Sequence, residues 1–100
     1  LEPLLTAAAW RNVIDAIERN DAHTRGIVVL GLGETKEKLA QSFSIAATYP
    51  LVKGFAVGRT IFADVAQQWF LGAKTDAKAI DEMAKNYQKV CVIWDKAKKA

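Results

Sequence analysis

The sequence is poor in the residues from which most disulfides, metal sites and catalytic triads are built. It has one cysteine, Cys91, and one histidine, His23, in 100 residues. A single cysteine excludes an internal disulfide, and one histidine with one cysteine does not make a metal-ligand cluster. One histidine in a polar loop also gives no serine–histidine–aspartate arrangement. We therefore expect no metal, no cofactor and a cytoplasmic setting.

Long apolar runs and a strong charge of one sign are also missing. No stretch approaches the roughly 20 apolar residues that a membrane helix needs, so no membrane partner is expected. The formal net charge is +3, and much of the excess lies in Lys85, Lys89, Lys96, Lys98 and Lys99. Lysines near the end of a helix are typical of a solvated face beside the negative end of the helix dipole. The other charges are mixed in sign, so no nucleic-acid partner is expected.

What is present is an alternation of helical and extended patterns. The order helix, strand, helix, strand, helix, helix predicts right-handed crossovers and a parallel sheet in an α/β fold. A run such as GIVVL, which is β-branched without polar alternation, favours a strand buried on both faces. The expected helices are 5–19, 35–48, one from Thr60 and one from Thr75 or Asp76, and the expected strands are 26–30 and 55–57.

Two strands are too few to complete such a fold. Two parallel strands cannot cover both faces of their sheet or protect both of its edges. The sequence also begins inside Leu1-Glu2-Pro3, which we interpret as the end of an extended segment, because a residue before proline avoids the helical region. We therefore interpret residues 1–100 as the C-terminal part of one domain that is incomplete on its own. The remaining strands would lie upstream in the same chain or on a second chain.

A glycine-rich turn follows each expected strand, Gly31-Leu32-Gly33 after the first and Gly58-Arg59 after the second. Parallel strands end at the same edge of a sheet, so the two turns are expected to lie side by side. In a (β/α)8 barrel the loops after strands seven and eight commonly hold a phosphate. The backbone N–H groups of the three glycines and the guanidinium of Arg59 therefore predict an anion site. The alternative is that the glycines only permit tight turns and Arg59 is a surface cation.

Two glutamates lie close to these turns in the sequence. Glu2 ends the first extended segment, so we expect it at the same edge, as a catalytic acid or base, as the partner of a lysine, or as a structural ion pair. Glu34 directly follows the first turn, and an anion site requires its carboxylate to point away. The segment GLGETK is not a dinucleotide fingerprint, because Lys36 stands where the third glycine is needed.

Four segments together resemble a known family: LEP at the start, RGIVVLGLG, VKGFAVGRTIFAD, and a final Tyr with Trp-Asp seven residues on, Tyr87 to Trp94-Asp95. They resemble the C-terminal domain of bacterial inositol-catabolism proteins that fuse a 5-dehydro-2-deoxygluconokinase to a class I aldolase-like barrel. Such domains are similar to tagatose-1,6-bisphosphate aldolase. The resemblance covers nearly the whole chain. It implies that the chain forms the end of strand six and then strands seven and eight of a (β/α)8 TIM barrel.

The resemblance also implies an activity, the retro-aldol cleavage of 2-deoxy-5-keto-gluconate 6-phosphate by a Schiff-base lysine. It places that lysine directly before Leu1, outside this sequence, with Glu2 beside it. The phosphate would be held by Gly31, Gly33, Gly58 and Arg59. No metal is needed, because the Schiff base replaces a Lewis acid. The implied partners are a phosphosugar, the rest of the barrel and other copies in a homo-oligomer.

Two other functions remain open at this point. The chain can belong to another phosphate-binding barrel enzyme, such as an isomerase or a synthase, which uses the same turns without a Schiff base. It can also be a non-catalytic barrel module attached to a sugar kinase.

Overall fold

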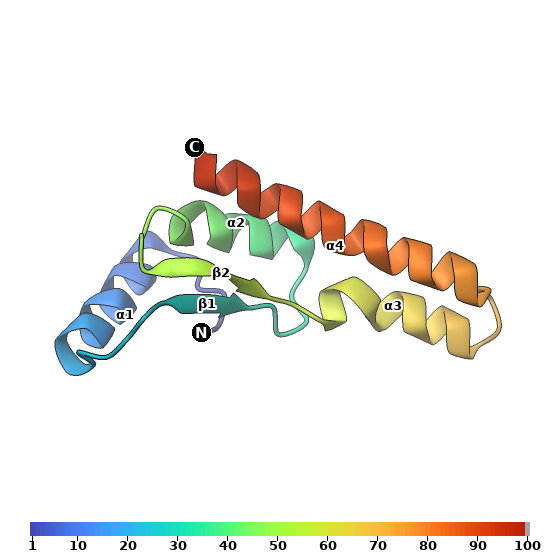
Figure 1. Ribbon diagram of the computed structural model, residues 1–100, viewed down its shortest axis with the longest axis horizontal. Coiled ribbons are helices and arrows are strands. Elements are labelled where there is room, and N and C mark those ends of the chain that lie inside the picture. The colour runs from blue at the N-terminus through green and yellow to red at the C-terminus, as the bar shows by residue number, and fades with distance from the viewer. Residues whose placement is uncertain (100) are drawn as a thin grey trace.

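The computed structural model describes residues 1–99 (Figure 1). The order of elements is the expected one, and β2 begins three residues before the expected strand. Lys53 and Gly54 hide this start in the sequence, because both residue types are depleted in strands. The elements are α1 (Ala7–Asn20), β1 (Ile27–Leu30), α2 (Lys36–Ala46), β2 (Val52–Ala56), α3 (Arg59–Phe70) and α4 (Asp76–Lys99).

Threonine side chains begin three of the four helices. The hydroxyl of Thr6 accepts a hydrogen bond from the backbone N–H of Ala9 at the start of α1. Thr35 caps α2 and Thr75 caps α4 in the same way, each at 3.3 Å from the backbone nitrogen three residues on. Each cap satisfies one of the N–H groups that a first helical turn leaves without a partner. Threonine is a favoured N-cap, which predicts the cap at Thr35, and of the two candidates at the start of α4, Thr75 and Asp76, it is Thr75 that caps the helix.

Glycine is the usual residue just beyond the end of a helix, which predicts that α3 stops before Gly72, and the helix indeed ends at Phe70. Gly72 has φ +77°, and its N–H donates to the carbonyl of Trp69 at 3.0 Å. The N–H of Ala73 reaches back to the carbonyl of Gln68 at 2.8 Å. This pair of bonds is a Schellman motif, which reverses the chain and sends it into α4.

We expect Gly72→Ala to lower the free energy of unfolding by about 1 kcal/mol, because an L side chain is strained at positive φ. Gly54→Ala is the matched control, since a Cβ there meets nothing within 4 Å and the φ of Gly54 is not positive. Its stability should be unchanged or slightly raised. Urea unfolding of both variants measures the difference. Equal stabilities of Gly72→Ala and Gly54→Ala would contradict the claim that an L side chain is strained at position 72.

The two strands pair in parallel, and the N-terminal segment extends the pairing on one side. Leu30 lies opposite Ala56 and Val29 opposite Phe55. The nitrogen of Leu1 donates to the carbonyl of Val28, and the N–H of Leu30 donates to the carbonyl of Leu1 at 2.7 Å. This is the hydrogen-bond pattern of a parallel pair. Leu1, β1 and β2 are therefore three adjacent parallel segments, joined through α1 and α2.

Helices α1 and α2 and the second half of α4 cover one face of this small sheet (Figure 1). Val29 and Phe43 are fully buried between the sheet and the helices. On the opposite face Val28 is 46% exposed and Leu30 is 38% exposed. The prediction that β1 is buried on both faces is therefore wrong for residues 1–99, because helices pack on only one side. The buried cluster consists of Trp10, Ile14, Ile27, Val29, Leu39, Phe43, Ala46, Val52, Val90 and Trp94.

Helix α3 continues away from the end of β2, and α4 returns beside it (Figure 1). The second half of α4 then packs over α2, where Val90 and Trp94 enter the buried cluster. Asn86 of α4 donates to the carbonyl of Ile61 in the first turn of α3 at 2.9 Å. The returning helix therefore holds the start of α3 in place. Within residues 1–99, no helix is both long enough and apolar enough to span a bilayer.

Candidate functional site

The turns after β1 and β2 meet at one edge of the sheet, as the sequence predicts. A Cβ placed on Gly33 would lie 3.4 Å from the guanidinium carbon of Arg59. The hydroxyl of Thr60 donates to the carbonyl of Glu34 at 2.6 Å. The guanidinium therefore packs on a bare stretch of backbone, and a hydrogen bond ties the first turn to the start of α3.

The first turn has a left-handed backbone at two successive residues. Leu32 has φ 53° and Gly33 has φ 76°, and the N–H of Glu34 closes the turn on the carbonyl of Gly31 at 3.0 Å. These are the features of a type I′ turn, in which glycine is favoured. Gly33 therefore serves two purposes, because it permits the turn and leaves space for the guanidinium.

Gly31 has a structural role in this turn. Its N–H donates to the carbonyl of Ala56 at 2.9 Å, so this group is committed to the sheet and not free for an anion. A Cβ on Gly31 would lie only 2.7 Å from a methyl carbon of Val57. Glycine is thus required here for the close approach of the two chain segments.

The start of α3 carries the free backbone donors. Gly58 is the N-cap and provides no side-chain cap, while its carbonyl accepts from the N–H groups of Ile61 and Phe62. Among residues 1–99, the N–H groups of Gly33, Gly58, Arg59 and Thr60 donate to no backbone carbonyl. Free N–H groups, the positive end of the helix dipole and an exposed guanidinium together form an arrangement that binds anions.

A pocket of about 610 Å³ opens at this point, between the start of α2, α3 and α4. Its volume lies in the range of small-molecule sites. Besides Gly33 and Arg59, which the sequence predicts, it contains several residues that we did not predict. The lining residues are Gly33, Glu34, Thr35, Lys36, Glu37, Arg59, Thr60, Ile61, Ala63, Asp64, Val65, Gln68, Glu82 and Asn86.

The carboxylates of the pocket are partly neutralised by lysines outside it. The carboxylate of Glu34 lies 3.6 Å from the ammonium of Lys38, and Glu82 forms an ion pair with Lys74. Glu37 and Asp64 form no ion pair among residues 1–99. Carboxylate oxygens without a cation are acceptors for hydroxyl groups. Four carboxylates, including that of Glu34, and two cations line the pocket, so an anionic group is favoured only beside Arg59 and the free N–H groups, and the rest of the pocket suits hydroxyls.

Glu2 lies at the same edge of the sheet but outside the pocket. It follows Leu1, whose carbonyl pairs with Leu30 near the end of β1, and its side chain is exposed. The residues described as lining the pocket do not include Glu2. The structure therefore brings Gly33, Gly58 and Arg59 together and leaves Glu2 on the other side of β1.

The residues missed from the sequence differ in how they could have been found. Asp64 lies four residues after Thr60 on α3. Residues at this spacing lie on the same face of a helix, so the position of Asp64 near Thr60 could have been predicted. Glu82 and Asn86 depend on α4 returning beside α3, which no local pattern in the sequence states. Their place in the pocket is a consequence of tertiary structure alone.

Other reactive side chains lie away from this site. His23 is exposed in the loop before β1, at the opposite end of the strands. The nearby Thr24 hydroxyl, together with the hydrogen bond that the His23 backbone N–H donates at 2.9 Å, lowers the pKa of Asp21 in that loop. On α4 the Cys91 thiol raises the pKa of Tyr87, one turn away. Among residues 1–99, no three His, Cys, Asp or Glu side chains group as metal ligands would.

The comparisons with known proteins give one match. Residues 1–98 match a family described as "Uncharacterized protein conserved in bacteria (DUF2090)". No curated protein and no solved structure matches the chain.

Proposed function

The chain belongs to this bacterial DUF2090 family, and we propose that it forms the C-terminal part of an aldolase-type (β/α)8 barrel. The barrel would work in the cytoplasm as a carbon–carbon lyase of inositol catabolism. Its substrate would be a phosphorylated keto-sugar acid of the type of 2-deoxy-5-keto-gluconate 6-phosphate. The partners would be this phosphosugar, the remaining strands in cis or on a second chain, and a second copy of the protein.

One observation carries the proposal, the contact of Arg59 with the bare backbone of Gly33 beside the free N–H groups of α3. This places a fixed positive charge and backbone donors at the C-terminal edge of two consecutive parallel strands. Phosphate sites of (β/α)8 barrels have the same place and the same components. The unpaired carboxylates of Glu37 and Asp64 add acceptors for sugar hydroxyls in the same pocket.

The arrangement of the strands supports a barrel as the parent fold. Leu1, β1 and β2 are adjacent and parallel, and α1 and α2 connect them in turn. The helices lie on one face, while Val28 and Leu30 are exposed on the other. Further strands would cover this open face and pair with the free edge of β2, as closure of a barrel requires.

The proposed reaction uses residues of this chain together with a lysine that is expected directly before Leu1. The lysine amine adds to the substrate ketone and water leaves, which gives a protonated imine. A base then removes the proton of the hydroxyl on the β-carbon, which is two carbons from the imine carbon. The bond between the α- and β-carbons breaks, and its electrons move into the imine. The aldehyde product departs, and the remaining enamine is protonated and hydrolysed. Arg59 and the α3 donors keep the phosphate fixed during these steps, and Glu2 is the proposed acid or base beside the lysine.

Borohydride trapping tests the activity. When the intact protein is incubated with the phosphorylated keto-sugar acid and borohydride, we expect a stable adduct at one lysine, visible as a mass increase. The control omits the substrate and should give no adduct. The absence of an adduct in both samples would contradict the aldolase proposal. If phosphosugar binding were retained in that case, another phosphate-binding barrel enzyme would be favoured.

A further inference from the structure

The tip of the α3–α4 hairpin carries an unusual concentration of exposed apolar side chains. Phe70 and Leu71 at the end of α3 are 78% and 76% exposed, and Ile80 on α4 is 65% exposed. Trp69 is 42% exposed beside them. We name these four residues the tip patch. The hairpin projects beyond the sheet (Figure 1), so nothing else within residues 1–99 covers the tip.

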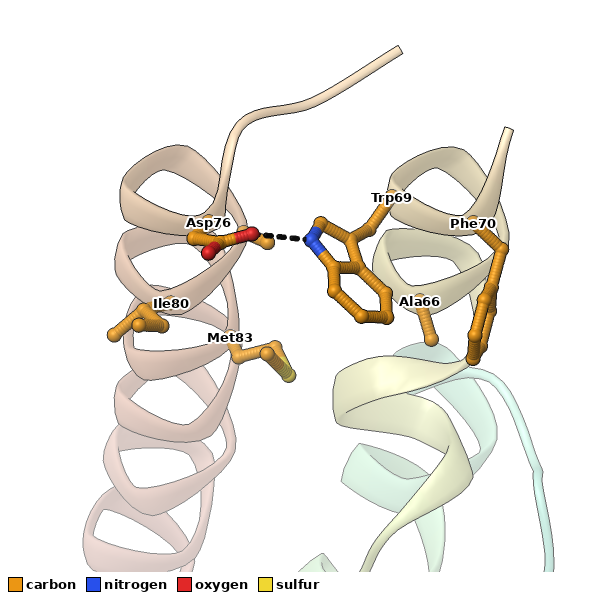
Figure 2. Close-up of a pocket in the computed structure, with 7 residues that line it drawn as sticks. Ala66, Trp69, Phe70, Asp76, Ile80 and Met83 are labelled. Atoms are coloured by element: carbon orange, nitrogen blue, oxygen red, sulfur yellow. Dashed lines mark hydrogen bonds between the residues drawn. The ribbon is translucent and has the colours of Figure 1, made fainter. Parts of the chain in front are cut away.

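An apolar groove of about 380 Å³ lies next to these side chains, between α3 and α4 (Figure 2). Its walls are Ala66, Trp69 and Phe70 on α3, and Ile80 and Met83 on α4. The indole N–H of Trp69 donates to the carboxylate of Asp76 at 2.6 Å, which fixes the ring between the two helices. The Trp69 ring is therefore a fixed wall of the groove, and its indole N–H already has a hydrogen-bond acceptor.

We propose that the tip patch is the contact surface between two copies of this protein. The tip patch contains a protruding side chain, Leu71, and it lies beside the groove, of which Phe70 is one wall. A surface with both parts is self-complementary, as a two-fold symmetric contact requires, because each copy then inserts its knob into the groove of the other. Two hairpins packed in this way would form a four-helix arrangement away from both sheets.

The exposed area is sufficient for such a contact. With about 150–250 Å² for a large aromatic side chain, the exposed fractions of the tip patch amount to roughly 500 Å² per copy. With all of this area covered, two copies would bury roughly 1,000 Å² from these four residues alone, which reaches the lower limit of about 1,000 Å² for a specific interface. A patch of roughly 500 Å² lies within the range of the largest apolar patch on a typical monomer, about 300–600 Å², and such patches are often functional.

The charges around the tip allow two copies to approach. Lys74, Lys78, Asp81, Glu82 and Lys85 line the neighbouring stretch of the hairpin and have mixed signs. Lys78 forms no ion pair among residues 1–99. In a two-fold contact it can face a carboxylate of the other copy, so the rim does not oppose association. This proposal rests on the hairpin and is independent of the lyase activity.

Sedimentation equilibrium of the intact protein across a concentration series tests the interface. We expect a dimer, and we expect Phe70→Glu to weaken the dimerisation constant at least roughly 30-fold, because it places a charge at the centre of the contact. Leu71→Glu should weaken the dimer in the same way. Leu71 lies outside both helices, so this variant tests the interface even if Phe70→Glu fails to fold. Val92→Glu is the matched control, an exposed apolar residue of α4 outside the patch, and should leave the dimer intact.

Two results would overturn the proposal. A wild-type protein that stays monomeric at every concentration would show that the patch has another occupant. A dimer that persists in both Phe70→Glu and Leu71→Glu would place the interface elsewhere. Neither result would affect the borohydride adduct, so the failure of this inference is distinguishable from the failure of the proposed activity.

Discussion

Replacing Arg59 with alanine is expected to weaken the binding of a phosphosugar roughly 10- to 100-fold, which is the usual worth of a hydrogen-bonded pair with a charged partner. The guanidinium lies against the backbone of Gly33 and beside the free N–H groups at the start of α3. Alanine removes the guanidinium beside the free N–H groups and leaves Lys36 as the remaining cation among the residues that line the pocket. Isothermal titration of the intact protein with the phosphosugar and with inorganic phosphate measures the loss.

Two further variants separate a specific role from a general effect of charge. Arg59→Lys keeps the charge but loses the planar fork of donors, so its affinity should lie between those of wild type and Arg59→Ala. Arg25→Ala removes an exposed arginine from the loop before β1, at the opposite end of the strands, and should bind as wild type does. Unchanged affinity in Arg59→Ala would remove the phosphate assignment. An equal loss in Arg25→Ala would indicate that only the net charge matters.

The sequence predicted those parts of the fold that local physics decides. Thr35 begins α2 because its hydroxyl caps the helix, and Gly72 ends α3 because only glycine adopts its φ without strain. The helical spacing of Leu39, Phe43, Ala46 and Ala47 predicts the inner stripe of α2. The first three are fully buried, and Ala47 is partly buried against the same cluster. The meeting of Gly33 and Arg59 was also predicted, since the ends of parallel strands share one edge.

The features that the sequence did not predict depend on which elements pack against each other, and not on local sequence patterns. A β-branched run indicates an apolar strand but not which of its faces is covered, and here Val28 and Leu30 have no cover. Helical spacing predicts that one side of α4 carries Ile80, Met83, Ala84, Tyr87, Val90, Cys91 and Trp94. Val90 and Trp94 are buried as expected, but Ile80 and Tyr87 are largely exposed, and Ala79, which was not expected, is buried. The apolar surface of α4 is larger than the area that the other elements within residues 1–99 cover. These exposed positions mark where further surfaces are expected to pack.

Phe43→Ala is expected to lower the free energy of unfolding by about 3–5 kcal/mol, the usual cost of removing a buried aromatic ring. Phe43 is fully buried where α2, β2 and α4 meet. Its ring centre lies 5.2 Å from that of Phe55 and 5.3 Å from that of Trp94, with an edge-to-face geometry in the second pair. Such pairs contribute beyond the area they bury. Urea unfolding of the intact protein measures the loss as a lower midpoint at an unchanged slope.

Tyr87→Ala is the matched control for this prediction. Its ring lies 6.4 Å from that of Phe55, in the same aromatic cluster, but it is 52% exposed. We expect it to cost clearly less than Phe43→Ala, since about half of the Tyr87 side chain stays in water after folding. A similar loss in both variants would contradict the central position of Phe43.

The consequence of Phe43→Ala should extend to the anion site. Phe43 holds Trp94 and thereby the second half of α4, and the first half of the same helix fixes the start of α3 through Asn86 and the carbonyl of Ile61. A loosened α4 therefore removes the support of the free N–H groups beside Arg59. We expect Phe43→Ala to weaken phosphate binding even under conditions where the protein stays folded, whereas Phe43→Leu, which fills much of the same volume, should keep most of it. Full phosphate affinity in a folded Phe43→Ala protein would show that the site does not depend on α4.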